Sequence, residues 1–167
     1  SFIHVSKLDY IIELESDLIE LPPPHIGDVE RAIGENIASL VKDGDCLQLG
    51  IGAIPDAVLL FLKDKKDLGI HSEMFSDGVV ELVEAGVITN AKKNIHKGKS
   101  VATFLMGTRR LYDYVDNNPE VAMMPVDYVN DPRVICQNDN LVSINSCVQV
   151  DLMGQVVSTC VGLRQIS

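Results

Sequence analysis

The sequence has little of what several common classes of protein function require. Basic residues are few: 14 Lys and Arg stand against 24 Asp and Glu, so the net charge is −10 and the isoelectric point lies near 4.7. This surplus of negative charge argues against nucleic acid or an anionic membrane surface as a partner. No apolar run approaches 18 residues and no signal peptide is recognisable, so we expect neither membrane insertion nor export.

Cysteine is scarce as well. The four cysteines, Cys46, Cys136, Cys147 and Cys160, lie far apart and form no C-x-x-C pair. Three of them fall in strand-like apolar runs, where a free cysteine behaves as a small hydrophobic residue. We therefore expect reduced thiols, no metal site and a cytoplasmic location.

The length and the hydrophobic pattern indicate one domain. The chain has 167 residues, of which 46% are hydrophobic, which is enough for one sizeable core. Strand-like and helix-like segments alternate, which predicts an α/β fold with an open, mostly parallel sheet flanked by helices. Residues 1–26 are expected to be a strand (residues 2–5) and a connector from a preceding domain, and residues 27–167 a single α/β domain. The serine at position 1 and a strand-like pattern at the C-terminal end suggest a piece of a longer polypeptide.

The spacing of apolar residues predicts the individual elements. Asp28 is the expected N-cap of a helix that ends near Gly44. The apolar positions expected to face the core from this helix are Val29, Ile33, Ile37, Leu40 and Val41. The other expected helices cover residues 55–62, 79–86 and 107–114, and the expected strands cover residues 46–49, 87–89, 100–106 and 121–124.

The C-terminal part shows strict alternation of apolar and polar residues, which predicts a β-hairpin over residues 142–161. Its apolar face is expected to consist of Val142, Ile144, Val148, Val150 and Leu152. The opposite face is polar and could simply be solvated. Lys92, Lys93, Lys97 and Lys99 form the main basic cluster, which we interpret as a solvated loop, although a lysine here could also reach a phosphate.

Residues 48–55, with the sequence QLGIGAIP, predict a strand that turns into a helix through two glycines. Pro55 suits the first turn of that helix. The backbone amides of such a turn, together with the positive end of the helix dipole, can bind an oxyanion or a phosphate. A tight connection without a ligand is an equally good interpretation. Because Pro55 replaces the third glycine of a dinucleotide-binding fingerprint, we do not expect a nicotinamide enzyme.

Residues 69–78, with the sequence GIHSEMFSDG, contain one glutamate in a segment too irregular for a helix interior. The carboxylate of Glu73 could face a ligand there, although a solvated loop carboxylate is the more common case. His71 is expected to be structural or orienting. Asn130 precedes Asp131 and Pro132 in a turn at the expected mouth of the sheet.

Four segments together resemble the acetyl-CoA hydrolase/transferase family of class I CoA-transferases. They are QLGIGAIP at residues 48–55, GIHSEM followed by SDG within residues 69–78, TFLMGT at 103–108, and VDLMGQ at 150–155. The resemblance extends from about Phe2 to Ser167 and implies a CoA-transferase-like fold. Full-length members also carry an N-terminal α/β domain before this region and a Gly-Val-Gly-Gly loop after it, so the resemblance implies a truncated C-terminal domain.

The resemblance implies a ping-pong mechanism with Glu73 as the nucleophile. CoA would move from an acyl-CoA, such as acetyl-CoA or butyryl-CoA, to a short-chain carboxylate, such as 4-hydroxybutyrate, through a glutamyl-CoA thioester. CoA would be a substrate and not a permanently bound cofactor, and no metal is implied. The residues implied in binding it are Gln48, Gly50, Ile51, Gly52, Ala53, Asn130 and Asn145. A homodimer is implied for the full-length protein.

Two alternatives remain open from the sequence. Relatives in the same family hydrolyse acyl-CoA when water replaces the carboxylate that resolves the thioester. The chain alone could also be a folded domain without activity, because part of the CoA site would come from the flanking regions.

Overall fold

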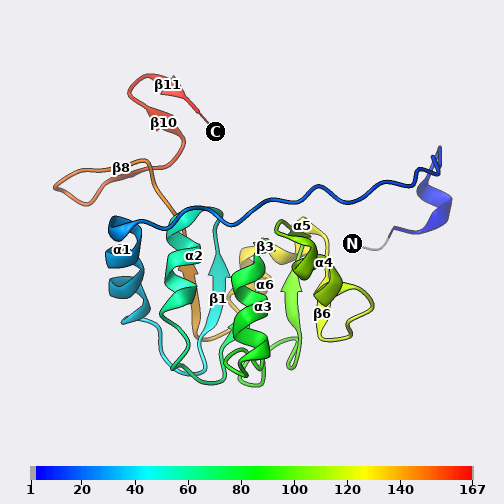
Figure 1. Ribbon diagram of the computed structural model, residues 1–167, viewed down its shortest axis with the longest axis horizontal. Helices are drawn as coiled ribbons and strands as arrows, with labels where there is room; N and C mark the ends of the chain where they lie inside the picture. Colours follow the sequence, from blue (N-terminus) through cyan, green and yellow to red (C-terminus); the bar gives the residue numbers. More distant parts are fainter. Residues whose placement is uncertain (1–2, 167) are drawn as a thin grey trace.

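Strand β1 (Cys46–Leu49) is the centre of the sheet and has neighbours on both sides. A computed structural model describes residues 3–166 (Figure 1). β1 pairs in parallel with β2 (Gly69–Ile70) on one side and with β7 (Leu141–Ile144) on the other. The end of β1 also pairs antiparallel with β3 (Met74–Phe75), with Leu49 opposite Met74. The bounds predicted for β1 are confirmed.

The sheet continues from β3 to β5 (Phe104–Leu105), which pairs with β3 in parallel. β4 (Ser100–Ala102) and β6 (Val121–Met123) form a separate parallel pair. An isolated bridge between His71 and Val101 links β4 to the segment that follows β2. The predicted α/β fold with a mostly parallel sheet is confirmed.

Six α-helices are present among the described residues: α1 (Asp28–Ala38), α2 (Ala53–Leu60), α3 (Asp77–Glu84), α4 (Arg109–Val115), α5 (Val126–Val129) and α6 (Pro132–Ile135). Helices α1, α2 and α3 lie side by side in front of the sheet in Figure 1. The core is formed between these helices and the strands, where Leu47, Val58, Ile70 and Val80 are fully buried. Burial of this apolar surface provides the main stabilisation of the fold.

Helix α1 differs from its predicted cap, end and buried face. Gly27 is the N-cap, and the helix ends at Ala38 instead of near Gly44. The buried residues of the helix are Gly34 and Ala38, whereas Val29 is 68% exposed. The reason is close packing on α2, because a Cβ at Gly34 would come within 2.8 Å of the Ala57 backbone. The helices approach through small residues, and Val29 and Leu40 are exposed. Ile37 packs against the core and Val41 is buried, as predicted for these two positions.

One predicted strand is divided into two short strands, and another predicted strand is absent. The strand predicted over residues 100–106 is interrupted at Thr103, which separates β4 from β5. The Thr103 backbone amide donates to the Glu73 carbonyl oxygen. Residues 87–89 form no strand, and Ile88 contributes only an isolated bridge with Leu68.

The N-terminal segment has no strand among its described residues. Val5–Lys7 forms a short 3-10 helix (η1), while Phe2, which was part of the predicted strand, lies outside the described residues. Residues 8–26 contain no helix or strand and run across the carboxyl ends of the strands (Figure 1). The Leu21 amide attaches this segment to the Gly107 carbonyl oxygen at 2.9 Å.

The C-terminal segment contains the predicted hairpin, but with different arms. β8 (Gln149–Val150) pairs antiparallel with β9 (Val156–Val157), and β10 (Cys160–Val161) pairs with β11 (Arg164–Gln165). The predicted first arm, residues 142–144, belongs to β7 in the main sheet, because it pairs in parallel with β1. The expected apolar face is wrong for its outer part, since Val148, Val150 and Leu152 are exposed.

Two further observations concern the cysteines and the membrane. Cys46 is buried as predicted, whereas Cys136 and Cys147 are exposed. None of the helices within residues 3–166 has the length and apolar character that a membrane crossing requires.

Candidate active site

Glu73 lies between β2 and β3, and the backbone on both sides of it is firmly held. The preceding residue, Ser72, is buried, and its hydroxyl both donates to the Leu49 carbonyl oxygen and accepts from the Leu49 amide, each at 3.1 Å. The Glu73 carbonyl oxygen accepts from the amides of Thr103 at 2.8 Å and Phe104 at 3.1 Å. The side chain is nevertheless exposed. The fold therefore presents one carboxylate to solvent on a fixed backbone.

Among residues 3–166, the carboxylate has one side-chain hydrogen-bond partner. The Asn130 amide nitrogen Nδ2 donates to Glu73 Oε2 at 2.7 Å, across 57 positions of sequence. Asn130 is the C-cap of α5, so the end of this helix determines where the amide points. The structure thus brings together two of the residues proposed for the site.

A second polar group lies at the carboxyl ends of β1 and β7. The Asn145 Nδ2 donates to Gln48 Oε1 at 2.8 Å, and the Gln48 Nε2 donates to Asn145 Oδ1 at 3.2 Å. The Ser143 hydroxyl also donates to Gln48 Oε1. Ser143 was not among the predicted site residues, although it lies on the same polar face as Asn145 and stands opposite Gln48 in the β1–β7 register.

The glycine turn joins these two polar groups. Leu49 pairs with Met74, and Gly50 and Glu73 are the residues that adjoin this pair along the chain. The Gly50 amide donates to the Ile144 carbonyl oxygen at 2.8 Å, and the Asn145 side chain packs against its Cα. Gly50 therefore has no free amide for a ligand, and its role is to allow this close packing.

The free donors of the turn come after Gly50. Gly52 is the N-cap of α2 and has a φ of 118°, a conformation that favours glycine. Within residues 3–166, no acceptor bonds the amides of Ile51, Gly52 or Ala53. These three amides lie at the N-terminus of α2, which is the positive end of its helix dipole, and they can stabilise a negatively charged oxygen.

Two buried basic side chains, Lys93 and His71, lie next to the end of β2, the strand that precedes Glu73. Lys93 is only 2% exposed, so the interpretation of its cluster as a solvated loop is wrong for this residue. Its ammonium nitrogen donates to the Ile70 carbonyl oxygen at 2.7 Å and the Lys99 carbonyl oxygen at 2.6 Å. His71 is 1% exposed, and its Nε2 lies 2.9 Å from the Val129 carbonyl oxygen. Burial lowers the pKa of His71 and lowers the pKa of Lys93 to about 8.

The Lys93 pKa predicts a specific dependence of stability on pH. The folded state releases the Lys93 proton near pH 8, whereas an ordinary lysine retains it to about 10.5. Between these values the unfolded chain binds more protons, so this contribution to the unfolding free energy increases with pH, by up to about 3 kcal/mol. We expect the unfolding free energy of the native protein, relative to Lys93→Met, to increase over this range in urea titrations.

The variant comparison is needed because Cys46 acts in the opposite direction. Burial raises the pKa of the Cys46 thiol to about 11, and this contribution to stability decreases as pH rises above 9. Cys46 is present in both proteins, so the part of its contribution that comes from burial, which is the largest, cancels. A difference that stays constant from pH 8 to 10.5 would show that Lys93 keeps an ordinary pKa.

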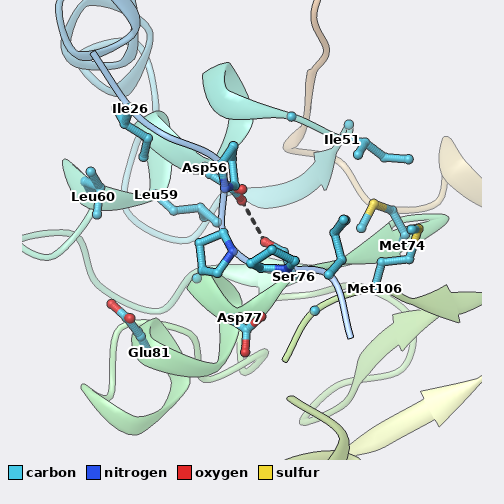
Figure 2. Close-up of a pocket in the computed structure, with 18 of the residues that line it drawn as sticks. Ile26, Ile51, Asp56, Leu59, Leu60, Met74, Ser76, Asp77, Glu81 and Met106 are labelled. Carbon is cyan, nitrogen blue, oxygen red and sulfur yellow. Dashed lines mark hydrogen bonds between the residues drawn. The ribbon is translucent and has the colours of Figure 1, made fainter. Parts of the chain in front are cut away.

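A cavity of about 230 Å³ lies under the N-terminal segment, between α2 and α3 (Figure 2). Ile51, Gly52 and Met74 are part of its wall, but Glu73 is not. The Ser76 hydroxyl donates to Asp56 Oδ1 at 2.7 Å within it, and burial raises the pKa of Asp56. The cavity thus shares the glycine turn with the site but does not contain the carboxylate. Among the described residues, no group of three or more His, Cys, Asp or Glu could hold a metal ion.

Comparisons with known proteins identify a family model and relatives with similar sequences. Residues 107–167 match the acetyl-CoA hydrolase/transferase C-terminal domain family. The whole chain is 71% identical to the 4-hydroxybutyrate coenzyme A transferase of Clostridium kluyveri, of which it covers 39%. It is 52% identical over 165 residues to the succinyl-CoA:cyclohexane-1-carboxylate CoA transferase of Geobacter metallireducens, covering 38% of that protein and 99% of this chain. The predicted resemblance to the acetyl-CoA hydrolase/transferase family is confirmed.

A solved CoA-transferase structure has the same fold as this chain over the matched region. The crystal structure of 4-hydroxybutyrate CoA-transferase from Porphyromonas gingivalis superposes with a TM-score of 0.87 at 54% identity. The match covers 92% of this chain and 39% of that one. The chain therefore spans about two fifths of the length of the relatives that it matches.

Proposed function

We propose that this chain, which is similar along its whole length to CoA-transferases of the acetyl-CoA hydrolase/transferase family, carries the nucleophile of an acyl-CoA:carboxylate CoA-transferase. The observation that supports this most is the exposed carboxylate of Glu73 on a backbone held from both sides. The carboxylate is oriented by Asn130 and lies next to the glycine turn. A reaction that uses a carboxylate as nucleophile needs these elements and no general base.

In the first step, a Glu73 carboxylate oxygen attacks the thioester carbonyl of the acyl-CoA. The C–S bond breaks, CoA leaves as a thiolate, and an acyl-glutamyl anhydride remains. The thiolate then attacks the glutamyl carbonyl, releases the acyl group as a carboxylate, and forms a glutamyl-CoA thioester. An acceptor carboxylate reverses both steps and restores Glu73.

Each step passes through a tetrahedral oxyanion. We propose that the free amides of Ile51, Gly52 and Ala53 donate hydrogen bonds to it, because no other residue uses them within the described chain. Loss of one such donor typically lowers kcat by about 100- to 1000-fold. Gln48, Asn130 and Asn145 complete the proposed contacts with CoA, while Gly50 allows Asn145 to pack closely against the turn.

The names of the relatives specify different carboxylates. We therefore propose a short-chain acyl-CoA as the donor and a carboxylate such as 4-hydroxybutyrate as the acceptor. Hydrolysis of the same thioester by water is the alternative outcome. Turnover with and without added carboxylate distinguishes the two. The homodimer, the cytoplasmic location and the division at residue 27 stay predictions from the sequence.

The direct test is to trap the covalent intermediate. The complete gene product that carries this chain is incubated with acetyl-CoA and then treated with borohydride, which reduces a glutamyl-CoA thioester to a primary alcohol. We expect peptide mass mapping to find the reduced residue at Glu73 and nowhere else. Modification of another residue, or turnover without any modification, would contradict the assignment.

A further inference from the structure

We infer that His71 is a positioning residue: its imidazole holds the end of helix α5 in place and thereby sets the Asn130 amide against the Glu73 carboxylate. This inference rests on the proposed function, because Glu73 must be the reacting group for its orientation to affect catalysis. The contacts that carry it form a closed ring of interactions within the described chain.

Two hydrogen bonds connect the loop of residues 71–73 with the end of α5. His71 Nε2 lies 2.9 Å from the Val129 carbonyl oxygen, and the neighbouring residue, Asn130, donates to Glu73 at 2.7 Å. A carbonyl oxygen can only accept, so Nε2 carries the proton and the tautomer of His71 is fixed. The loop that carries Glu73 therefore also carries His71, the side chain that holds the position of Asn130.

The imidazole does more than fill space. His71 Nδ1 is buried and has no hydrogen-bond partner among the described residues, which is costly for a polar atom. An apolar side chain of the same size would avoid that cost. What only a donor at this position can supply is the bond to Val129.

Helix α5 needs such a bond because it is short. It contains four residues, and a single turn gains little stability from its own hydrogen bonds. A second histidine supports the adjacent residue: His96 Nε2 lies 2.7 Å from the Tyr128 hydroxyl, with the rings edge to face. Two consecutive residues of α5, Tyr128 and Val129, are thus each held by one imidazole.

Burial keeps the His71 ring neutral, because it is the largest effect and lowers the pKa. The hydrogen bond to Val129 raises the pKa, and the charges of Lys93 and His96, the titratable groups that act on the ring, lower it. Lys93 also bonds the carbonyl oxygen of Ile70, the residue before His71. A neutral His71 with a fixed tautomer is therefore the form that supports α5 at neutral pH.

The test compares two substitutions of His71 in the complete gene product. His71→Met keeps the volume but removes the donor, whereas His71→Gln can still offer an N–H to the Val129 carbonyl oxygen. We expect His71→Met to lower kcat about 10- to 100-fold with a similar KM. We expect His71→Gln to recover most of that loss.

A double variant separates positioning from general destabilisation. If His71 acts through Asn130, the double variant His71→Met/Asn130→Ala is no slower than Asn130→Ala alone. Multiplicative losses, or full activity of His71→Met, would overturn the inference.

A third measurement does not depend on turnover. In the complete gene product, the NMR signals of the Asn130 side-chain amide are expected to shift in both His71→Met and Glu73→Gln. Unchanged signals in His71→Met would overturn the inference even if activity fell. Retained transferase activity in Glu73→Gln would instead refute the proposed function, so the two failures are distinguishable.

Discussion

Replacement of Glu73 by Gln is expected to lower the rate of acyl transfer by roughly 10⁴-fold or more, the scale seen when an enzyme loses its nucleophile. A carboxamide oxygen is a weak nucleophile and cannot give the anhydride that the next step requires. The substitution keeps the shape of the side chain, and the Gln Oε1 can still accept from the Asn130 amide. The assay follows CoA exchange between acetyl-CoA and 4-hydroxybutyrate or butyrate.

The same variant should keep its stability, because Glu73 is exposed and exposed substitutions usually change the unfolding free energy by less than about 0.5 kcal/mol. Glu35→Gln is the matched control: Glu35 lies exposed on α1 and loses the same charge. We expect it to retain normal turnover. If Glu73→Gln were also active, or if both variants lost activity alike, the carboxylate of Glu73 would not be the nucleophile.

Much of the central fold could be predicted because its signals are local. The apolar run of β1 is bounded by Asp45 and Gly50, and the following helix begins directly after Gly52, so strand, turn and helix were recognised from adjacent residues. Helix α3 ends before Gly86, whose φ of 74° explains why glycine stands there.

The errors concern features that depend on distant neighbours. The apolar pattern of residues 142–150 fits a hairpin arm, but β1 offers a longer parallel pairing to residues 141–144, and that pairing prevails. The buried face of α1 depends on Gly34 meeting Ala57, which no periodicity indicates. In both cases tertiary packing outweighs the local pattern.

In the candidate site, too, the features with local signals could be predicted and the contacts between distant residues could not. The irregular segment around Glu73 and the glycine turn are visible in the sequence, and their proximity follows from one short pairing of β1 with β3. The bond from Asn130 to Glu73 spans 57 positions and leaves no local signal. The burial of Lys93 was missed because a lysine in a loop with three others has the composition of a solvated surface.

Substitution of Gly52 by Val is expected to lower kcat by about 100- to 1000-fold, the effect of losing an oxyanion donor. With a φ of 118°, Gly52 has a conformation that a β-branched residue rarely adopts. The backbone must rotate to relieve this strain, and the free amides of Ile51, Gly52 and Ala53 turn with it. Apart from the two neighbouring residues, no atom of the described chain lies within 4 Å of the added Cβ, so the effect comes from the backbone and from the space that a ligand would occupy.

Gly86→Val is the matched control for this substitution. Gly86 also has a positive φ, of 74°, and open space at its Cβ, but it follows α3 and takes no part in the proposed site. Gly86→Val should lose about 1 to 2 kcal/mol of unfolding free energy. Gly52→Val should lose more, because its φ of 118° with a ψ of −177° is a conformation that essentially only glycine adopts. Only Gly52→Val should lose turnover. Equal loss of activity in the two variants, or normal turnover in Gly52→Val, would mean that the turn is only a tight connection and that its amides do not bind the oxyanion.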